Sequence, residues 1–576
     1  MLHSVAAMLG TQPAALSVLL LLLLSYPLGY ALRIHTQRLA PDLRHVIHVL
    51  LGFSYAYACF GWHGILHPLF AATTTYALIA LLPAFPGAAA AVVFNGVYIL
   101  ERYHHVSSAA TYDVDYTTVL CMFTLRLMSL AIDRYDGAKL MAKFRNARTT
   151  VAGTSGGDPK DAGTFFSPVR RGHRGEQTSR FSAYNAIALI AMPSYLEVLG
   201  YVFYPFVILT GPPFPFALYL RFVEGDLYGH STPRVDALLG AQRPVPLHSA
   251  PDTDPLEQKI HAQHVIMAKA EGRPPPAKTA IRPAMRNLMT GMAYMLIYQL
   301  VGSYFPVSRL VSPEFLDPQH HSLLYRVVIM LVTARVHATM YYAIWQLTEG
   351  ALTMHGISFN GYEPESGSPL FTGLENLNVA SLELATSLAG VISGFNMRTN
   401  EWTKHYAFKR IGLALGSRMG GQFLSLLWLC VWHGTAFGYF ATFGLEFAMM
   451  TALTIANSYT ADYRAWMDAN HATDRQAKRH RLAFKAASWA VTWIWLSGGF
   501  TPFHLKSFER CAIAFKGGYW VIPAWVGLVI LVNVPMKRFY LHGRRKARIE
   551  YSQSSTPAST MAAMTETTTT ESKKMS

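Results

Sequence analysis

The 576-residue chain is poor in charged residues and in cysteine. Asp, Glu, Lys and Arg together make up 14% of it, whereas ordinary soluble domains carry about 25%. There are therefore too few polar residues to cover a water-soluble globule of this size. The four cysteines form no CxxC pair, which excludes a disulfide-stapled secreted scaffold and indicates neither a metal site nor a redox motif. Because 51% of the residues are hydrophobic, a disordered or collagen-like chain is excluded as well.

Long apolar runs recur along the chain, and a transmembrane helix needs roughly 20 mainly apolar residues. The first run, residues 16–32, follows no Lys or Arg and has no small-residue cleavage site, which predicts a retained span and not a signal peptide. We predict an all-α fold, a polytopic transmembrane helical bundle with roughly nine to twelve membrane segments. The candidate segments are residues 16–32, 46–60, 65–82, 87–100, 117–132, 196–209, 288–301, 323–345, 423–439, 442–456, 486–496 and 521–534.

The formal net charge is +16 with histidine neutral. Such a surplus can serve nucleic-acid binding, but here Lys and Arg lie mainly between the apolar runs. That placement is typical of cytoplasmic loops that face anionic lipid head groups. We therefore predict membrane lipid, and no nucleic acid, as the partner of these charges.

Residues 1–542 are predicted to form one multi-span domain with two extramembrane loops. Residues 138–182 hold nine Lys or Arg against three Asp or Glu, which is typical of a basic, flexible loop. Residues 224–286 are polar, charged and rich in proline, which indicates a second loop. The tail, residues 543–576, is rich in Ser and Thr without apolar periodicity, so we expect it to be disordered.

The last residues carry a lysine pair, Lys573 and Lys574, at the fourth and third positions from the end. This spacing matches the dilysine retrieval pattern of endoplasmic reticulum membrane proteins, although a polar tail can also contain such a pair by chance. The retrieval interpretation predicts a multi-pass protein of the endoplasmic reticulum membrane with a cytosolic C-terminus. The basic segment GRRKAR at residues 543–548 fits the same side of the membrane.

His433 lies in a stretch, residues 424–439, that contains no Lys, Arg, Asp or Glu. Ionisable groups inside membrane segments are costly and usually line interior cavities, and a neutral imidazole there can accept a proton as a general base must. The alternative is a structural histidine bonded to another helix. A second Trp-His-Gly sequence, at residues 62–64, lies between two candidate spans, where Trp and His are common interfacial anchors. We interpret that copy as structural.

Residues 376–410 form an amphipathic segment that mixes aromatic and cationic side chains. One interpretation is an interfacial helix with its cations among lipid phosphates. The other is that these cations contact an anionic substrate head group or cofactor phosphates, and the two are compatible. Asn396, within this segment, is neither an aromatic anchor nor a charge, so the interfacial interpretation does not explain it.

Several ordered patches, spread over about residues 40–540, resemble the membrane-bound O-acyltransferase superfamily. The branch they resemble most is that of the lysophospholipid acyltransferases, near the lysophosphatidylcholine acyltransferases of the endoplasmic reticulum. The patches are DYTT at 115–118 leading to DG at 136–137, PSYLE at 193–197 followed by TGPPF at 210–214, YYAIW at 341–345 followed by GISFNG at 356–361, Asn396 with Trp402, and WHG at 432–434. Phe395 stands where relatives often carry Trp, and Thr118 where they often carry Gly.

The resemblance implies that an acyl group moves from acyl-CoA, a co-substrate, to the free hydroxyl of a lysophospholipid, with no bound cofactor. Lysophosphatidylcholine is the expected acceptor, with lysophosphatidylethanolamine and lysophosphatidylserine also used, in phospholipid remodelling with unsaturated acyl donors. The resemblance places this reaction in a cavity inside the bundle, with His433 as general base and Asn396 as the second catalytic residue. A Cys430–acyl intermediate is a disfavoured alternative, because buried thiols in apolar surroundings are usually inert.

Further residues are predicted to contact substrate. The candidates for phosphate contacts are Arg398, Lys404, Lys409 and Arg410, and the candidates for the cavity wall are Tyr342, Trp345, Asn360, Glu383 and Trp402.

Two other functions stay open at this point. An acyltransferase of the same superfamily can act on another acceptor, such as diacylglycerol, a sterol or a protein. A transporter is a more distant alternative, since it is expected to show inverted repeats and no internal repeat is evident. The sequence also leaves open whether the chain forms a homodimer.

Overall fold

The computed structural model of the chain describes residues 2–8, 10–106, 114–153, 187–225, 227, 274–363, 365–470 and 474–521, with isolated positions at 523, 524, 527 and 531. Within these residues the regular structure is helical, apart from two isolated β-bridges. The helices are α1 (Leu2–Met8), α2 (Pro13–His35), α3 (Pro41–Leu81), α4 (Ala84–Val106), α5 (Tyr116–Gly153), α7 (Tyr195–Val202), α8 (Phe216–Glu224), η3 (Ala277–Ala280), α11 (Ile281–Gly302), η4 (Val307–Val311), α12 (Pro313–Leu316), α13 (Leu323–His355), α14 (Val379–Glu383), α15 (Leu388–Gly394), α16 (Met397–Trp402), η5 (Thr403–Phe408), α17 (Lys409–Leu415), α18 (Arg418–His433), α19 (Phe437–Tyr459), α20 (Ala461–Asn470), α21 (Arg475–Leu505), α22 (Phe508–Ala514) and η6 (Phe515–Tyr519).

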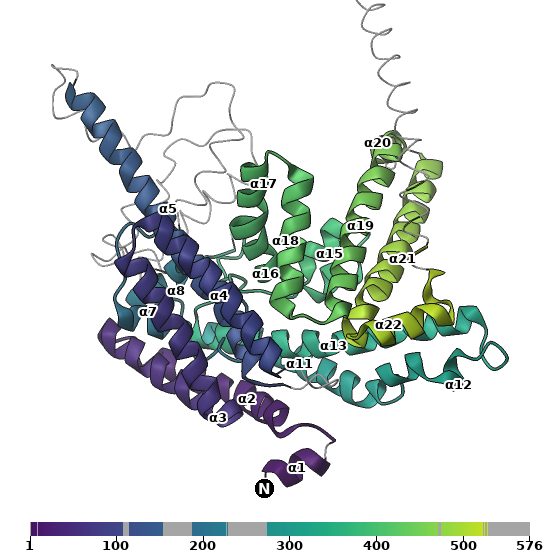
Figure 1. The fold of residues 1–576 in the computed structure, drawn as a ribbon, viewed down its shortest axis with the longest axis horizontal. Coiled ribbons are helices and arrows are strands. Elements are labelled where there is room, and N and C mark those ends of the chain that lie inside the picture. The colour runs from purple at the N-terminus through teal and green to yellow at the C-terminus, as the bar shows by residue number, and fades with distance from the viewer. Residues whose placement is uncertain are drawn as a thin grey trace, which may run out of the picture.

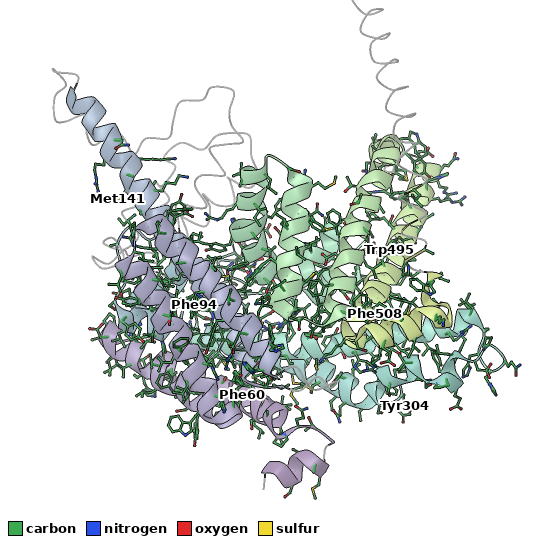
Figure 2. All side chains as sticks on the ribbon, viewed as in Figure 1. Phe60, Phe94, Met141, Tyr304, Trp495 and Phe508 are labelled. Carbon is green, nitrogen blue, oxygen red and sulfur yellow. The ribbon has the colours of Figure 1, made fainter. Side chains whose placement is uncertain are left out.

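Five described helices, α2, α3, α4, α5 and α13, are long and apolar enough to cross a membrane. This confirms the predicted all-α, polytopic helical fold. Large apolar side chains are exposed, as expected of a surface that faces lipid: Phe508 is 66% exposed, and Tyr304, at the lower edge of the molecule in Figure 2, is 75% exposed.

The N-terminal half packs around one apolar core. Helices α2 to α5 lie against one another and against the short α7 and α8 (Figure 1). The long helix α13 contacts α2 on this side and α21 on the other, while α11 packs along it. In Figure 1, α11 and α13 run below α16, α18, α19 and α21, which stand as a second group of helices. Helix α13 therefore joins the two halves.

Four predicted spans differ in the structure. The predicted segments 46–60 and 65–82 belong to one helix, α3, which is kinked at Gly61 (φ 59°, ψ −148°), a conformation that glycine adopts without steric cost. Segment 196–209 forms only the eight-residue α7 followed by turns, too short to span a membrane. Segment 423–439 is broken at Gly434 (φ 126°), so α18 ends there and α19 begins at Phe437.

Parts of the predicted loops are helical. Helix α5 continues to Gly153, so residues 138–153 are not a flexible loop but an extension of that helix. At the end of the second loop, η3 and the first turns of α11 occupy residues 277–286. Most of both loops, most of segment 521–534, the tail and its lysine pair lie outside the described residues.

Candidate active site

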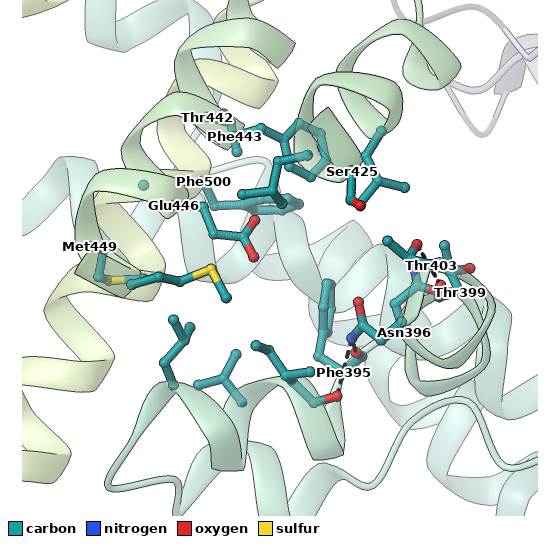
Figure 3. Close-up of a pocket in the computed structure, with 18 of the residues that line it drawn as sticks. Phe395, Asn396, Thr399, Thr403, Ser425, Thr442, Phe443, Glu446, Met449 and Phe500 are labelled. Carbon is teal, nitrogen blue, oxygen red and sulfur yellow. Dashed lines mark hydrogen bonds between the residues drawn. The ribbon is translucent and has the colours of Figure 1, made fainter. Parts of the chain in front are cut away.

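A cavity of about 400 Å³ lies among α13, α15, α16, η5, α18, α19 and α21. Most of its wall is apolar, and a few polar side chains reach it (Figure 3). The polar and charged residues of the wall include Asn396, Lys404, Arg418, Gln422, Ser425, His433, Thr442 and Glu446. The structure therefore brings Asn396 and His433 to one enclosure, although 37 positions separate them in the sequence.

His433 is the last residue of α18. This helix begins after Ser417, whose hydroxyl accepts a hydrogen bond from the Gly420 amide at 3.0 Å, and it ends because Gly434 takes a positive φ of 126°. The end of the helix thus exposes the imidazole to the cavity.

Aromatic rings enclose the imidazole of His433. Phe443 stacks on it with ring centroids 5.4 Å apart, and Phe503 meets it edge-on at 5.1 Å. The neighbouring Trp432 is fixed by a hydrogen bond from its indole N–H to the Cys121 carbonyl at 2.8 Å. Within the described part of the chain the His433 ring nitrogens make no hydrogen bond, so they are available to a substrate.

Asn396 precedes α16 in a left-handed conformation (φ 48°, ψ 45°), which Asn tolerates better than most residues. Its main-chain carbonyl accepts the Asn400 amide at 3.0 Å. Its side-chain oxygen accepts a hydrogen bond from Asn376 Nδ2 at 3.4 Å. Figure 3 shows the Asn396 side chain on the wall opposite Glu446. No described residue accepts a hydrogen bond from its Nδ2, which leaves this donor for a ligand.

The segment that holds Asn396 is anchored to α13 by Glu349. One carboxylate oxygen of Glu349 accepts the main-chain N–H groups of Asn376 at 2.7 Å and of Leu377 at 2.9 Å. Asn376 then accepts the amides of Met397 at its main-chain oxygen, at 2.9 Å, and of Arg398 at Oδ1, at 3.0 Å. These bonds lock the start of α16 to α13. In the sequence, the one signal for these bonds is an acidic residue within an apolar helix.

Of the five residues predicted to line the cavity wall, one does so and four lie elsewhere. Trp345 lines the cavity. The hydroxyl of Tyr342 donates to Glu383 at 2.8 Å, and Glu383 also pairs with Arg335, outside the cavity wall. Two others are likewise placed elsewhere: Trp402 is buried and donates from its indole to the Leu125 carbonyl at 3.0 Å, and Asn360 bonds Thr372 at 2.9 Å in an exposed loop.

Of the four predicted phosphate contacts, Lys404 is the one on the described cavity wall. Arg398 pairs with Glu401 at 2.6 Å, and Arg410 binds Asp136 through two bonds of 2.6 and 3.1 Å. Lys409 is not part of the wall. Lys404 belongs to η5, a π-helical turn of a kind often found at functional sites.

Two charged residues of the wall, Arg418 and Glu446, were not predicted from the sequence. Arg418 opens α18, where a cation opposes the helix dipole, and Glu446 is the one acidic residue of α19. Both features are visible in the sequence once the helix boundaries are known. Among the described residues neither side chain forms an ion pair.

The fold and the site define a multi-pass membrane protein with an internal, mainly apolar cavity that contains an imidazole and a carboxamide. The family model of the membrane-bound O-acyltransferases matches residues 104–496, and the chain belongs to that family. This confirms the resemblance of the sequence patches and removes the transporter alternative.

Similar proteins lie in the branch that the patches resemble. The chain is 24% identical over 521 residues to "Lysophospholipid acyltransferase 5" of Rattus norvegicus, covering 90% of this chain and 88% of that protein. It is 26% identical over 450 residues to the Homo sapiens protein of that name, covering 78% and 75%. The Drosophila melanogaster protein of that name is 26% identical over 465 residues, covering 80% and 75%.

Proposed function

We propose that the protein is a lysophospholipid acyltransferase that transfers an acyl chain from acyl-CoA to the free hydroxyl of lysophosphatidylcholine. In this proposal it is a 1-acylglycerophosphocholine O-acyltransferase that also uses lysophosphatidylethanolamine and lysophosphatidylserine. The observation that carries the proposal is the placement of Asn396 and His433 on the wall of one apolar cavity. The names of the similar proteins support the acceptor class.

His433 would act as the general base. A glycerol hydroxyl is a weak nucleophile at neutral pH, so a neighbouring base must remove its proton as the oxygen attacks. The oxygen attacks the thioester carbonyl carbon, the carbon–sulfur bond breaks, and the thiolate of CoA takes the proton from the imidazolium. The proton of the hydroxyl thus ends on the CoA thiol, and the neutral imidazole of His433 is regenerated within one turnover.

Asn396 would stabilise the charge that develops on the thioester carbonyl oxygen. Its Nδ2 is free to donate a hydrogen bond, and Asn376 holds its other amide atom. Donors fixed before the reaction stabilise such an oxyanion without reorganising in the transition state. Cys430 is buried and is not part of the described cavity wall, which favours direct transfer over a Cys–acyl intermediate.

The remaining wall suits the two lipid substrates. Apolar and aromatic side chains accommodate acyl chains, while Lys404 and Arg418 offer positive charge to phosphate groups. We further propose that the enzyme resides in the endoplasmic reticulum membrane with a cytosolic C-terminus. The lysine pair at 573–574 supports this location. Association into a homodimer stays an open prediction.

The proposal is tested by acyl transfer in membranes that express the full chain. Lysophospholipids of different head groups are offered with arachidonoyl-, linoleoyl- or oleoyl-CoA, and His433→Ala, Asn396→Ala and His63→Ala are compared at matched protein levels. We expect transfer to lysophosphatidylcholine that is lost in the first two variants and kept in the third. Full activity of His433→Ala would refute its role, and absence of transfer to every lysolipid would indicate another acceptor.

A further inference from the structure

Glu446 places a carboxylate in the middle of an apolar enclosure. Figure 3 shows it pointing from α19 into the cavity, beside Phe443 and Phe500, and not toward a neighbouring helix. Across the described part of the chain it forms neither a hydrogen bond nor an ion pair. Burying a carboxylate in such surroundings is costly unless it is paired. The partner of Glu446 is therefore to be sought in a bound ligand.

The surroundings of Glu446 indicate which chemical group of a ligand would bind beside its carboxylate. An acyl chain carries no charge, and a phosphate would be repelled by the carboxylate. Aromatic rings continue along the wall: Phe500 and Phe503 stack at 5.0 Å, and Trp345 contacts Phe395 at 5.0 Å. A carboxylate beside aromatic faces is a setting that favours an organic cation, and quaternary ammonium groups in particular.

The charges of the cavity wall have a pattern that suits a zwitterion. Lys404 on η5 and Arg418 on α18 supply positive charge, and Glu446 is the acidic residue among the described residues of the wall. A zwitterionic head group carries a phosphate and an ammonium group a few bonds apart. Helix α19 connects Glu446 to the proposed base, His433. Glu446 lies about one helical turn after Phe443, and the ring of Phe443 stacks on the imidazole of His433.

We propose that Glu446 and the adjoining aromatic wall bind the ammonium group of the acceptor lipid. This subsite makes the enzyme selective for lysolipids whose head group carries a positive nitrogen. The inference rests on the proposed function and adds a residue that determines specificity.

The test compares wild type with Glu446→Gln, which keeps the size and hydrogen-bonding capacity of the side chain but removes its charge. The full chain in membranes is given oleoyl-CoA with lysophosphatidylcholine, lysophosphatidylethanolamine or lysophosphatidylglycerol of the same acyl chain. We expect wild type to favour the two cationic head groups. In Glu446→Gln, kcat/KM for those two should fall at least about tenfold, because the buried ammonium group of the lipid would have no opposite charge beside it. The kcat/KM for lysophosphatidylglycerol should change little.

Two further variants keep the test sharp. Glu446→Asp retains the charge and should recover part of the selectivity, and Glu509→Gln makes the same chemical change on the exposed surface of α22 and should behave as wild type. An equal loss for all three lysolipids, or an unchanged selectivity ratio in a folded Glu446→Gln, overturns the subsite alone. A wild type without preference for cationic head groups also overturns it. A wild type that acylates no lysolipid overturns the proposed function itself.

Discussion

Glu349 is expected to be essential for anchoring the segment that carries Asn396 to α13, although Glu349 itself lies outside the cavity wall. Its Oε1 accepts two buried main-chain N–H groups, from Asn376 at 2.7 Å and Leu377 at 2.9 Å. A buried donor left without an acceptor costs about 1–3 kcal/mol. Glu349→Ala should therefore lower the free energy of unfolding by about 2–6 kcal/mol. Glu349→Gln should lose much less, since its amide oxygen can accept both bonds.

The same substitution should slow catalysis through Asn396. Asn376 bonds the Asn396 side chain at 3.4 Å and both Met397 and Arg398 through their amides. A displacement of about 1 Å in such a group can reduce the rate about 100-fold. We expect Glu349→Ala to reduce kcat by this order, with a smaller change in KM for acyl-CoA.

The assay combines heat inactivation of the detergent-solubilised protein with acyl-transfer kinetics. Glu363→Ala serves as the matched control, because that acid is exposed in the loop after α13 and its carboxylate accepts a local hydrogen bond from the Ser366 hydroxyl at 2.7 Å. A Glu349→Ala protein with the inactivation temperature and kcat of wild type would refute the reasoning. So would a Glu349→Gln protein as impaired as the alanine variant.

Three further predictions concern the cavity itself. Asn396→Ala should reduce kcat by about 10²–10³, the usual effect of removing one oxyanion donor, with KM nearly unchanged in steady-state kinetics. Gly434→Ala should cost about 1–3 kcal/mol of stability, measured by heat inactivation, because a φ of 126° is strained for any side chain and its Cβ would lie 3.3 Å from a neighbouring ring. Lys404→Ala and Arg418→Ala should each raise KM for acyl-CoA or lysolipid several-fold with little change in kcat, since phosphate contacts bind the ground and transition states alike.

Matched controls separate these effects from general damage. Gly444→Ala adds the same methyl group on α19, where no atom beyond the adjacent helix backbone lies within 4 Å of the added Cβ, and should not destabilise the protein. Arg475→Ala removes a cation from the exposed start of α21 and should leave KM unchanged. An Asn396→Ala protein with wild-type kcat, a Gly434→Ala protein as stable as Gly444→Ala, or unchanged KM values in both cation variants would contradict the corresponding prediction.

The membrane character, the helical class and the family could all be predicted from the sequence. These follow from local properties: apolar runs of sufficient length demand helices in lipid, because every main-chain polar group must be paired within its own segment. His433 and Asn396 also stood out locally, the first as a lone ionisable group in an apolar stretch and the second as an amide that interfacial anchoring does not explain.

Which polar residues face the cavity could not be predicted from the sequence, because it depends on how distant helices pack. Arg410 appeared equivalent to Lys404 in the sequence, yet it pairs with Asp136 on α5, far away along the chain, whereas Lys404 and Arg418 reach the cavity wall. The anchoring of Asn396 through Glu349 likewise joins α13 to α16 across a loop. Charge and periodicity are properties of short windows, but ion pairing and cavity exposure depend on which distant helices meet. That is set by side-chain packing, which the linear pattern does not specify.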